Sequence, residues 1–162
     1  MNLKFVFLIL LFFSFSNLKS QTFRIENHCQ AKELVYNHLL SKNHNGIKIK
    51  NISYSGMNNA LGLFQYKSKF NDLPASGIVL SSGKAKDAMG PNDGTASNEN
   101  HAKGDIDLSA INNLKTFDSS ILEFDFMSLT DSIRFVFQFA SEEYPEYVKK
   151  GVSDIFGFLS KT

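Results

Sequence analysis

The sequence predicts a mainly β fold, an antiparallel β-sandwich with jelly-roll character and one amphipathic helix near its start. Two observations carry this prediction. Apolar and polar residues alternate with a period of two in several segments after residue 46, whereas the three-and-four spacing of a helix is strong only once. Seven phenylalanines fall between Phe124 and Phe158, and burial of each is worth about 1.5–3 kcal/mol, which predicts that this segment lies at the centre of a packed sheet.

Residues 1–20 have the features of a secretory signal peptide. Lys4 supplies a basic start, and the apolar run from Phe5 to Phe15 is too short to span a bilayer. We place cleavage after Ser20. A lipoprotein would need a cysteine directly after the cut, and the single cysteine of the chain is Cys29. The sequence therefore predicts a secreted protein, extracellular or at the cell surface, with no lipid anchor.

The remaining residues, 21–162, are expected to form one β domain with one core. Without Lys4 and Lys19 the formal net charge falls from +1 to −1, so nothing indicates a nucleic-acid partner. The mature chain has no candidate transmembrane segment. A single cysteine cannot form an internal disulfide, which favours a domain held together by its core.

The helical signal covers Asn27 to Lys42. Asn27 and Gln30 resemble a capping box, and Asn45-Gly46 is expected to end the helix. One face carries Ala31, Leu34, Val35, His38 and Leu39. His38 is interpreted as a boundary histidine, because no second ligand stands beside it at metal spacing.

Strands are predicted over three segments that follow this helix: 47–54, 61–66 and 77–80. In the first, Ile47 and Ile49 alternate with lysines, and the alternation resumes on a shifted phase after Asn51. Gly56 to Asn59 is expected to form a turn.

Two further alternating runs lie near the carboxyl end. Residues 122–126 and 132–140 are separated by a five-residue polar break, Met127 to Asp131, which predicts an antiparallel hairpin. The segment Ser141 to Tyr147 would then display its acids at the end of a central strand, where scaffolds often carry functional groups.

Calcium binding is one hypothesis for these acids. Residues 84–107 form a long region without periodicity, and such regions are usually functional or disordered. Carboxylates from this region and from the carboxyl end could together surround a calcium ion: Asp105, Asp107, Glu142, Glu143 and Asp154. The other hypothesis is structural, with Ser141 capping a turn and the glutamates bonding backbone amides.

A catalytic alternative rests on Glu123 and Asp125, which share one face of a predicted strand. They resemble the acid pair of a jelly-roll glycosidase, but Ser128 stands where the glucanase pattern has its second glutamate. Glu142 or Glu143 could serve as the partner of Glu123 in a carbohydrate-active enzyme. A solvated polar strand face is the competing interpretation, and we predict no enzyme and no catalytic residue.

A series of short motifs runs from Leu34 to Leu159. They are Tyr54-Ser55-Gly56, Leu61-Gly62, Ser76 to Gly83, Gly90-Pro91-Asn92, Gly104-Asp105, Asp118 to Phe126, Phe139 to Tyr144 and Asp154 to Phe158. In this order they resemble the choice-of-anchor L domain, a family found on secreted bacterial surface proteins, often of Bacteroidetes.

The resemblance implies an exported, surface-associated, mostly β domain, and it supplies no catalytic residues. It also implies further strands and an anchoring or sorting module after Thr162, so that the chain would be a fragment with an unpaired last strand. The function expected from the sequence is non-catalytic adhesion or ligand binding, with a glycan or a surface protein as the partner.

Overall fold

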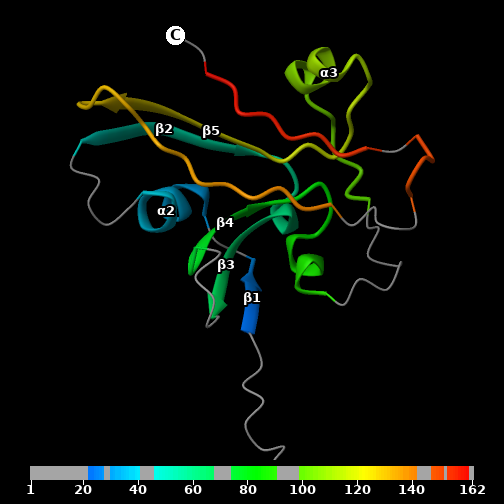
Figure 1. Cartoon of the computed structure of the whole chain (residues 1–162), viewed down its shortest axis with the longest axis horizontal. Helices are drawn as coiled ribbons and strands as arrows, with labels where there is room; N and C mark the ends of the chain where they lie inside the picture. Colours follow the sequence, from blue (N-terminus) through cyan, green and yellow to red (C-terminus); the bar gives the residue numbers. More distant parts are fainter. Residues whose placement is uncertain are drawn as a thin grey trace, which may run out of the picture.

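The computed structural model of the chain describes residues 22–27, 30–40, 46–67, 74–90, 99–141, 147–151 and 153–160. Within these ranges, five strands form two antiparallel sheets that lie in separate layers, with few helical segments (Figure 1). The prediction of a mainly antiparallel β fold is confirmed. The predicted signal peptide, residues 1–20, lies outside the described ranges.

The first sheet has β3 at its centre. It contains β1 (Thr22–Glu26), β3 (Leu61–Lys67) and β4 (Ser76–Leu80) in the order β1-β3-β4. The strands predicted at 61–66 and 77–80 are therefore present, whereas β1 was not predicted. The buried Ile25 of β1 lies opposite Phe64 in the register. A side chain at Gly62 would place its Cβ 2.9 Å from Cγ2 of Ile25, so the close approach of the two strands requires glycine there.

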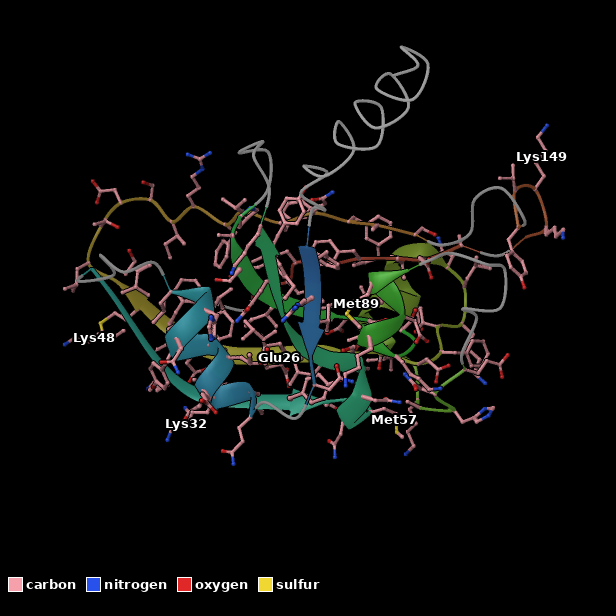
Figure 2. The ribbon with its side chains drawn as sticks, turned by 90° about the horizontal axis from the view of Figure 1, so that it is seen from below. Glu26, Lys32, Lys48, Met57, Met89 and Lys149 are labelled. Atoms are coloured by element: carbon pink, nitrogen blue, oxygen red, sulfur yellow. The ribbon has the colours of Figure 1, made fainter. Side chains whose placement is uncertain are left out.

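A short 3-10 helix, η3 (Ala85–Met89), covers the outer side of β1. The backbone N–H of Ile25 donates to Sδ of Met89 at 3.2 Å, and Figure 2 shows Met89 beside the strand. Ala85 is fully buried. Because β1 is an edge strand, this contact supplies a partner for a backbone donor that would otherwise face solvent.

The second sheet pairs β2 (Ile47–Ser55) with β5 (Ile121–Ser128). The register passes from Lys50 opposite Asp125 to Ser53 opposite Glu123, so β2 contains one extra residue at this point. Asn51 takes a φ of 53° there. The phase shift that the sequence predicts after Asn51 is therefore confirmed as a β-bulge.

The predicted hairpin of residues 122–126 with 132–140 is wrong. β5 pairs with β2, and the residues that follow it, 132–140, run extended without belonging to a strand (the orange trace of Figure 1). The polar break bends the chain at residues 129–131, but Leu129 N donates to the carbonyl of Gly46 at 2.7 Å and so continues the contact of β5 with β2. An alternating pattern specifies which face of the sheet a residue occupies, but it does not specify which strand the segment pairs with.

The predicted amphipathic helix is present but shorter than expected. It consists of α2 (Ala31–Leu34), which continues as the π-helical turn η1 (Val35–Leu39). The predicted capping box is wrong, because the N-cap Gln30 makes no side-chain capping bond. The side-chain amide of Asn27 donates instead to the carbonyl of Asn59 at 3.2 Å, which ties the start of the helix to the turn before β3.

The buried core lies between the two sheets and α2. Leu34 of α2 contacts Leu61 and Leu63 of β3, and these three side chains are buried. The partly buried side chains packed around them are Ala31, Tyr54 and Ile78, which come from α2, β2 and β4. The core therefore joins both layers through the helix, and it is built from leucines and not from the phenylalanines near the carboxyl end.

The aperiodic region 84–107 is not one continuous loop in its described parts. It begins with η3, and its end leads into a second helix, α3 (Ile106–Asn112). A further 3-10 turn, η2 (Asn58–Ala60), lies within the turn predicted before β3. Residues 91–98 lie outside the described ranges.

Candidate functional site

The predicted calcium ligand Asp105 has a structural role as the N-cap of α3. Its Oδ1 accepts a hydrogen bond from the backbone N–H of Leu108 at 2.7 Å. Its backbone is held as well, because the hydroxyls of Ser109 and Thr116 both donate to its carbonyl, at 2.5 and 2.8 Å. One oxygen of the Asp105 carboxylate is therefore engaged within α3, and Asp107 follows in the first turn of the same helix.

The predicted ligand Asp154 is bonded to the segment that leads to Glu142 and Glu143. The hydroxyl of Ser141 donates to Oδ2 of Asp154 at 2.8 Å. A Cβ built on Gly157 would lie 2.6 Å from Cδ2 of Leu108, so α3 touches the same carboxyl-terminal segment.

The structure thus brings the elements that carry Asp105, Asp107 and Asp154 together, but it does not gather their carboxylates into one cluster. Among the described residues, no group of three or more histidine, cysteine or acidic side chains is arranged to hold a metal ion. Glu142 and Glu143 lie outside the described ranges. The calcium hypothesis therefore has two of its five ligands in a segment that the structure does not describe.

The carboxylates of the catalytic alternative lie on the outer face of the β2-β5 sheet. Glu123 and Asp125 are exposed, and Glu123 stands opposite Ser53. The side-chain amide of Asn51 donates to Oδ2 of Asp125 at 2.6 Å, which links the bulge to the neighbouring strand. This arrangement fits a solvated polar face of an antiparallel sheet.

Hydrogen bonds to the carboxylate of Asp118 fix the loop before α3. Its carboxylate accepts hydrogen bonds from the backbone N–H groups of Asn100 and Ala102, at 3.1 and 2.5 Å. The side-chain amide of Asn100 donates in turn to the carbonyls of Ser82 and Gly83, at 3.0 and 2.8 Å. Asp118 belongs to the motif that runs from Asp118 to Phe126, but the sequence analysis predicted this role for neither residue. The φ of 52° at Asp118 shows a turn that an aspartate tolerates better than most side chains.

Five phenylalanines form a continuous exposed surface, which we call the aromatic face. They come from the two carboxyl-terminal segments: Phe135, Phe137, Phe139, Phe156 and Phe158. The ring centroids of Phe135 and Phe158 are 4.4 Å apart, and those of Phe137 and Phe156 are 5.1 Å apart. The two segments therefore run antiparallel and are in contact through their rings.

The aromatic face corrects the prediction that all seven phenylalanines are buried. Its five residues are between 37% and 68% exposed, with Phe137 at the upper limit, and Phe126 of β5 is 42% exposed. Among the described residues, neither segment belongs to a sheet. A phenylalanine pattern predicts apolar contact, but it does not specify whether the contact lies inside the chain or with a partner.

Tyr54 links the two sheets at the other side of the core. Its hydroxyl donates to the carbonyl of Met57 at 2.9 Å and lies 3.0 Å from the hydroxyl of Ser120. Burial raises the pKa of the Tyr54 hydroxyl, and the hydrogen bond with Ser120 offsets part of the rise. The position is structural, because the ring packs against the leucine core.

Two antiparallel sheets and a small leucine core define a mainly β domain. The family model of the choice-of-anchor L domain matches residues 21–162, so the chain belongs to that family and the resemblance seen in the sequence is confirmed. The family is surface-associated and is not a known enzyme family. None of the curated proteins and none of the solved structures matches the chain. Within the described ranges, no helix has the length and apolar character needed to cross a membrane.

Proposed function

We propose that the chain is an exported, non-catalytic adhesion domain that binds a partner through its aromatic face. The observation that carries the proposal is the exposure of five adjoining phenylalanine rings on one surface. Monomeric proteins rarely leave such contiguous apolar patches uncovered unless they are contact surfaces. Membership in a surface-associated family supports the same proposal, since the face would then meet the extracellular environment.

A protein partner fits this face better than a glycan. Sugars are held by aromatic rings together with converging polar groups. The sequence neighbours of these rings include the polar Arg134 and Gln138, but the exposed Val136 and Leu159 extend the surface as an apolar one. Aromatic residues are enriched in protein interfaces, where they supply most of the binding energy. A glycan is the competing class of partner, and binding to a glycan array tests it directly.

Binding to cells tests the proposal. The full chain, fluorescently labelled, is added to intact cells of its source, and retention is compared with that of the variants Phe137→Asp and Met127→Asp. Met127 is a matched control, because it is 55% exposed on β5 and lies outside the aromatic face. Retention by the wild type and Met127→Asp, with loss in Phe137→Asp, supports the proposal. Equal retention by all three chains contradicts it.

The catalytic alternative can be tested with the same purified chain. Hydrolysis of a polysaccharide that disappears in Glu123→Gln would establish an enzyme that uses Glu123 with Glu142 or Glu143. Binding on a glycan array without turnover would assign a glycan partner to a non-catalytic domain. We expect neither hydrolysis nor an effect of Glu123→Gln on cell retention.

A separate part of the proposal is that a calcium ion stabilises the acidic segment from Ser141 to Tyr147. It would bind Glu142 and Glu143 together with Asp154, to which Ser141 already connects their segment. Asp105 and Asp107 could complete such a site only with the oxygens that the capping bond leaves available. The partner interaction through the aromatic face does not depend on this ion.

A further inference from the structure

A second group of exposed apolar side chains lies on α3 and the turn that follows it. Its four members are Ile106 at 83% exposure, Ile111 and Leu114 at 58% each, and Phe117 at 64%. Figure 1 shows α3 above the β2-β5 layer, and no described strand makes more than slight contact with this helix. Packing within the described part of the domain therefore does not account for these side chains.

Two lysines lie beside the ring of Phe117. Nζ of Lys115 is 4.9 Å from the ring centroid, which is a cation–π distance. Lys103 pairs with Phe117 in an isolated antiparallel bridge, and the side chains of such a pair lie on the same face. Both lysines are exposed. We call these residues together the α3 surface: Lys103, Ile106, Ile111, Leu114, Lys115 and Phe117.

The acids of the same region are less accessible than its lysines. Asp105, Asp107 and Asp118 are each only partly exposed. The carboxylates of Asp105 and Asp118 also accept hydrogen bonds from backbone N–H groups. Although the three acids outnumber the two lysines, the charged groups that stand most openly beside the apolar side chains are therefore cations.

Hydrogen bonds hold the α3 surface in one shape. The backbone N–H of Asp105 donates to the hydroxyl oxygen of Thr116 at 2.9 Å, and the hydroxyl oxygens of Ser109 and Thr116 lie 2.8 Å apart. These contacts tie the start of the helix to the turn after it, and Asn113 ends the helix with a φ of 54°. A surface that is ordered in advance loses little conformational freedom when it binds.

The composition of the α3 surface fits a lipid bilayer better than a protein. Protein interfaces are enriched in aromatic residues, methionine and arginine, and they are depleted of lysine. Elements that lie on a membrane combine leucine, phenylalanine and similar side chains with lysines. The alkyl stem of a lysine lies along apolar surface while its ammonium group reaches the headgroups. Here three aliphatic side chains and one ring stand beside two exposed lysines.

We propose that the α3 surface docks on a lipid bilayer that carries anionic headgroups. The four apolar side chains enter the boundary between headgroups and acyl chains, and the two lysines stay among the phosphate groups. The contact is peripheral and reversible, because α3 is far shorter than a membrane-spanning helix. This site is separate from the aromatic face and does not rest on the function proposed for that face.

Cosedimentation of the full chain with vesicles tests the proposal. Vesicles of phosphatidylcholine with about one quarter phosphatidylglycerol are compared with vesicles of phosphatidylcholine alone. We expect binding to the anionic vesicles, and it should weaken from about 0.1 to about 1 M salt because salt screens the lysines. Lys103→Gln combined with Lys115→Gln should weaken it about tenfold or more. Lys48→Gln combined with Lys50→Gln is the control, because both lysines are exposed on β2, and it should leave binding unchanged.

The apolar side chains are tested by removal and by a fluorescent reporter. Ile111→Ser should weaken vesicle binding about tenfold, whereas Met127→Ser on β5 should not. Ile111 is 58% exposed, so the variant should keep the wild-type circular dichroism spectrum. Because the chain contains no tryptophan, Phe117→Trp introduces a single reporter. Its emission should shift to shorter wavelength on anionic vesicles, and that of Met127→Trp should stay unchanged.

The outcomes that overturn the proposal are defined by the same variants. They are a wild-type chain that does not sediment with anionic vesicles, and binding that both Ile111→Ser and the Lys103, Lys115 double variant leave intact. Binding that Phe137→Asp removes and Ile111→Ser retains would assign the membrane contact to the aromatic face. The effect of Phe137→Asp on cell retention, measured in the Ile111→Ser background, reports on the aromatic face alone, so the two proposals can fail independently.

Discussion

The phenyl rings of Phe135 and Phe158 lie 4.4 Å apart between their centroids, although no backbone hydrogen bond joins the described parts of their segments. Their contact is therefore made by side chains alone. In β5, by contrast, the backbone is paired along its length with β2. The carboxyl-terminal segments consequently depend on ring packing, and on any partner, for their order.

Amide hydrogen exchange should report this difference directly. At about 1 μM, we expect the amides of residues 133–139 to exchange much faster than those of β2 and β5, because they lack ladder hydrogen bonds. The measurement is hydrogen-exchange mass spectrometry of the full chain. Strong protection of residues 133–139 would contradict the unpaired backbone.

Substitution of Asp105 should separate its capping role from calcium binding. Asp105→Ala removes the acceptor of the Leu108 N–H and should destabilise the domain by about 1 kcal/mol. Asp105→Asn keeps a good N-cap and should unfold at nearly the wild-type urea concentration.

Thermal melting with calcium and with a chelator completes this test. If Asp105 is also a ligand, calcium should raise the melting midpoint of the wild type more than that of Asp105→Asn. An identical wild-type melting midpoint in excess calcium and in excess chelator would contradict the calcium hypothesis.

The sequence was sufficient to predict β2, its bulge and the two strands that follow. Asn51 interrupts an otherwise regular alternation, and a one-residue insertion is the simplest way to keep Ile52 and Tyr54 facing the core after Ile47 and Ile49. The partner of β5 could not be predicted, because alternation specifies faces and not neighbours. A local hairpin was assumed, and the longer-range pairing with β2 occurs instead.

The helix α3 was missed although its start carries a recognisable signal. Asp105 precedes an apolar residue and supplies the N-cap, with Asp107 in the first turn, as is common at helix starts. The same two carboxylates also suit a calcium ion, so the sequence pattern alone does not distinguish a ligand from a helix cap. The hydrogen bond from Asn100 to Asp118 could not be predicted, because it depends on contacts between loops that only the fold brings together.

Tyr54 should make stability fall at alkaline pH. Burial raises the pKa of its hydroxyl above the ordinary value of 10.0, so folding favours the protonated phenol. Its contribution is therefore fully present below pH 10.0 and is lost as the pH rises through the raised pKa. We expect the urea midpoint of the wild type to fall more steeply above this pH than that of Tyr54→Phe. Parallel pH profiles would contradict the assignment.

At neutral pH the same variant should show the cost of the lost hydrogen bonds. Tyr54→Phe leaves the carbonyl of Met57 and the hydroxyl of Ser120 without this partner, and we expect a loss of about 1 kcal/mol in the free energy of unfolding. The comparison of urea curves at pH 7 with those above pH 10.0 separates the two effects.

Gly104 is a position at which an added methyl group should cost much stability. A Cβ at this position would overlap the backbone carbonyl of Thr116, which is held in place because the Thr116 hydroxyl bonds to Asp105 on both sides. Neither backbone segment can move away without breaking this network. We therefore expect Gly104→Ala to lower the free energy of unfolding by about 1–3 kcal/mol or more. Gly46→Ala is the control, because its nearest obstacle is a side-chain methyl of Thr130 at 3.3 Å, and it should stay within about 0.5 kcal/mol of wild type. Equal urea midpoints for the two variants would show that the turn between Gly104 and Thr116 is looser than these contacts imply.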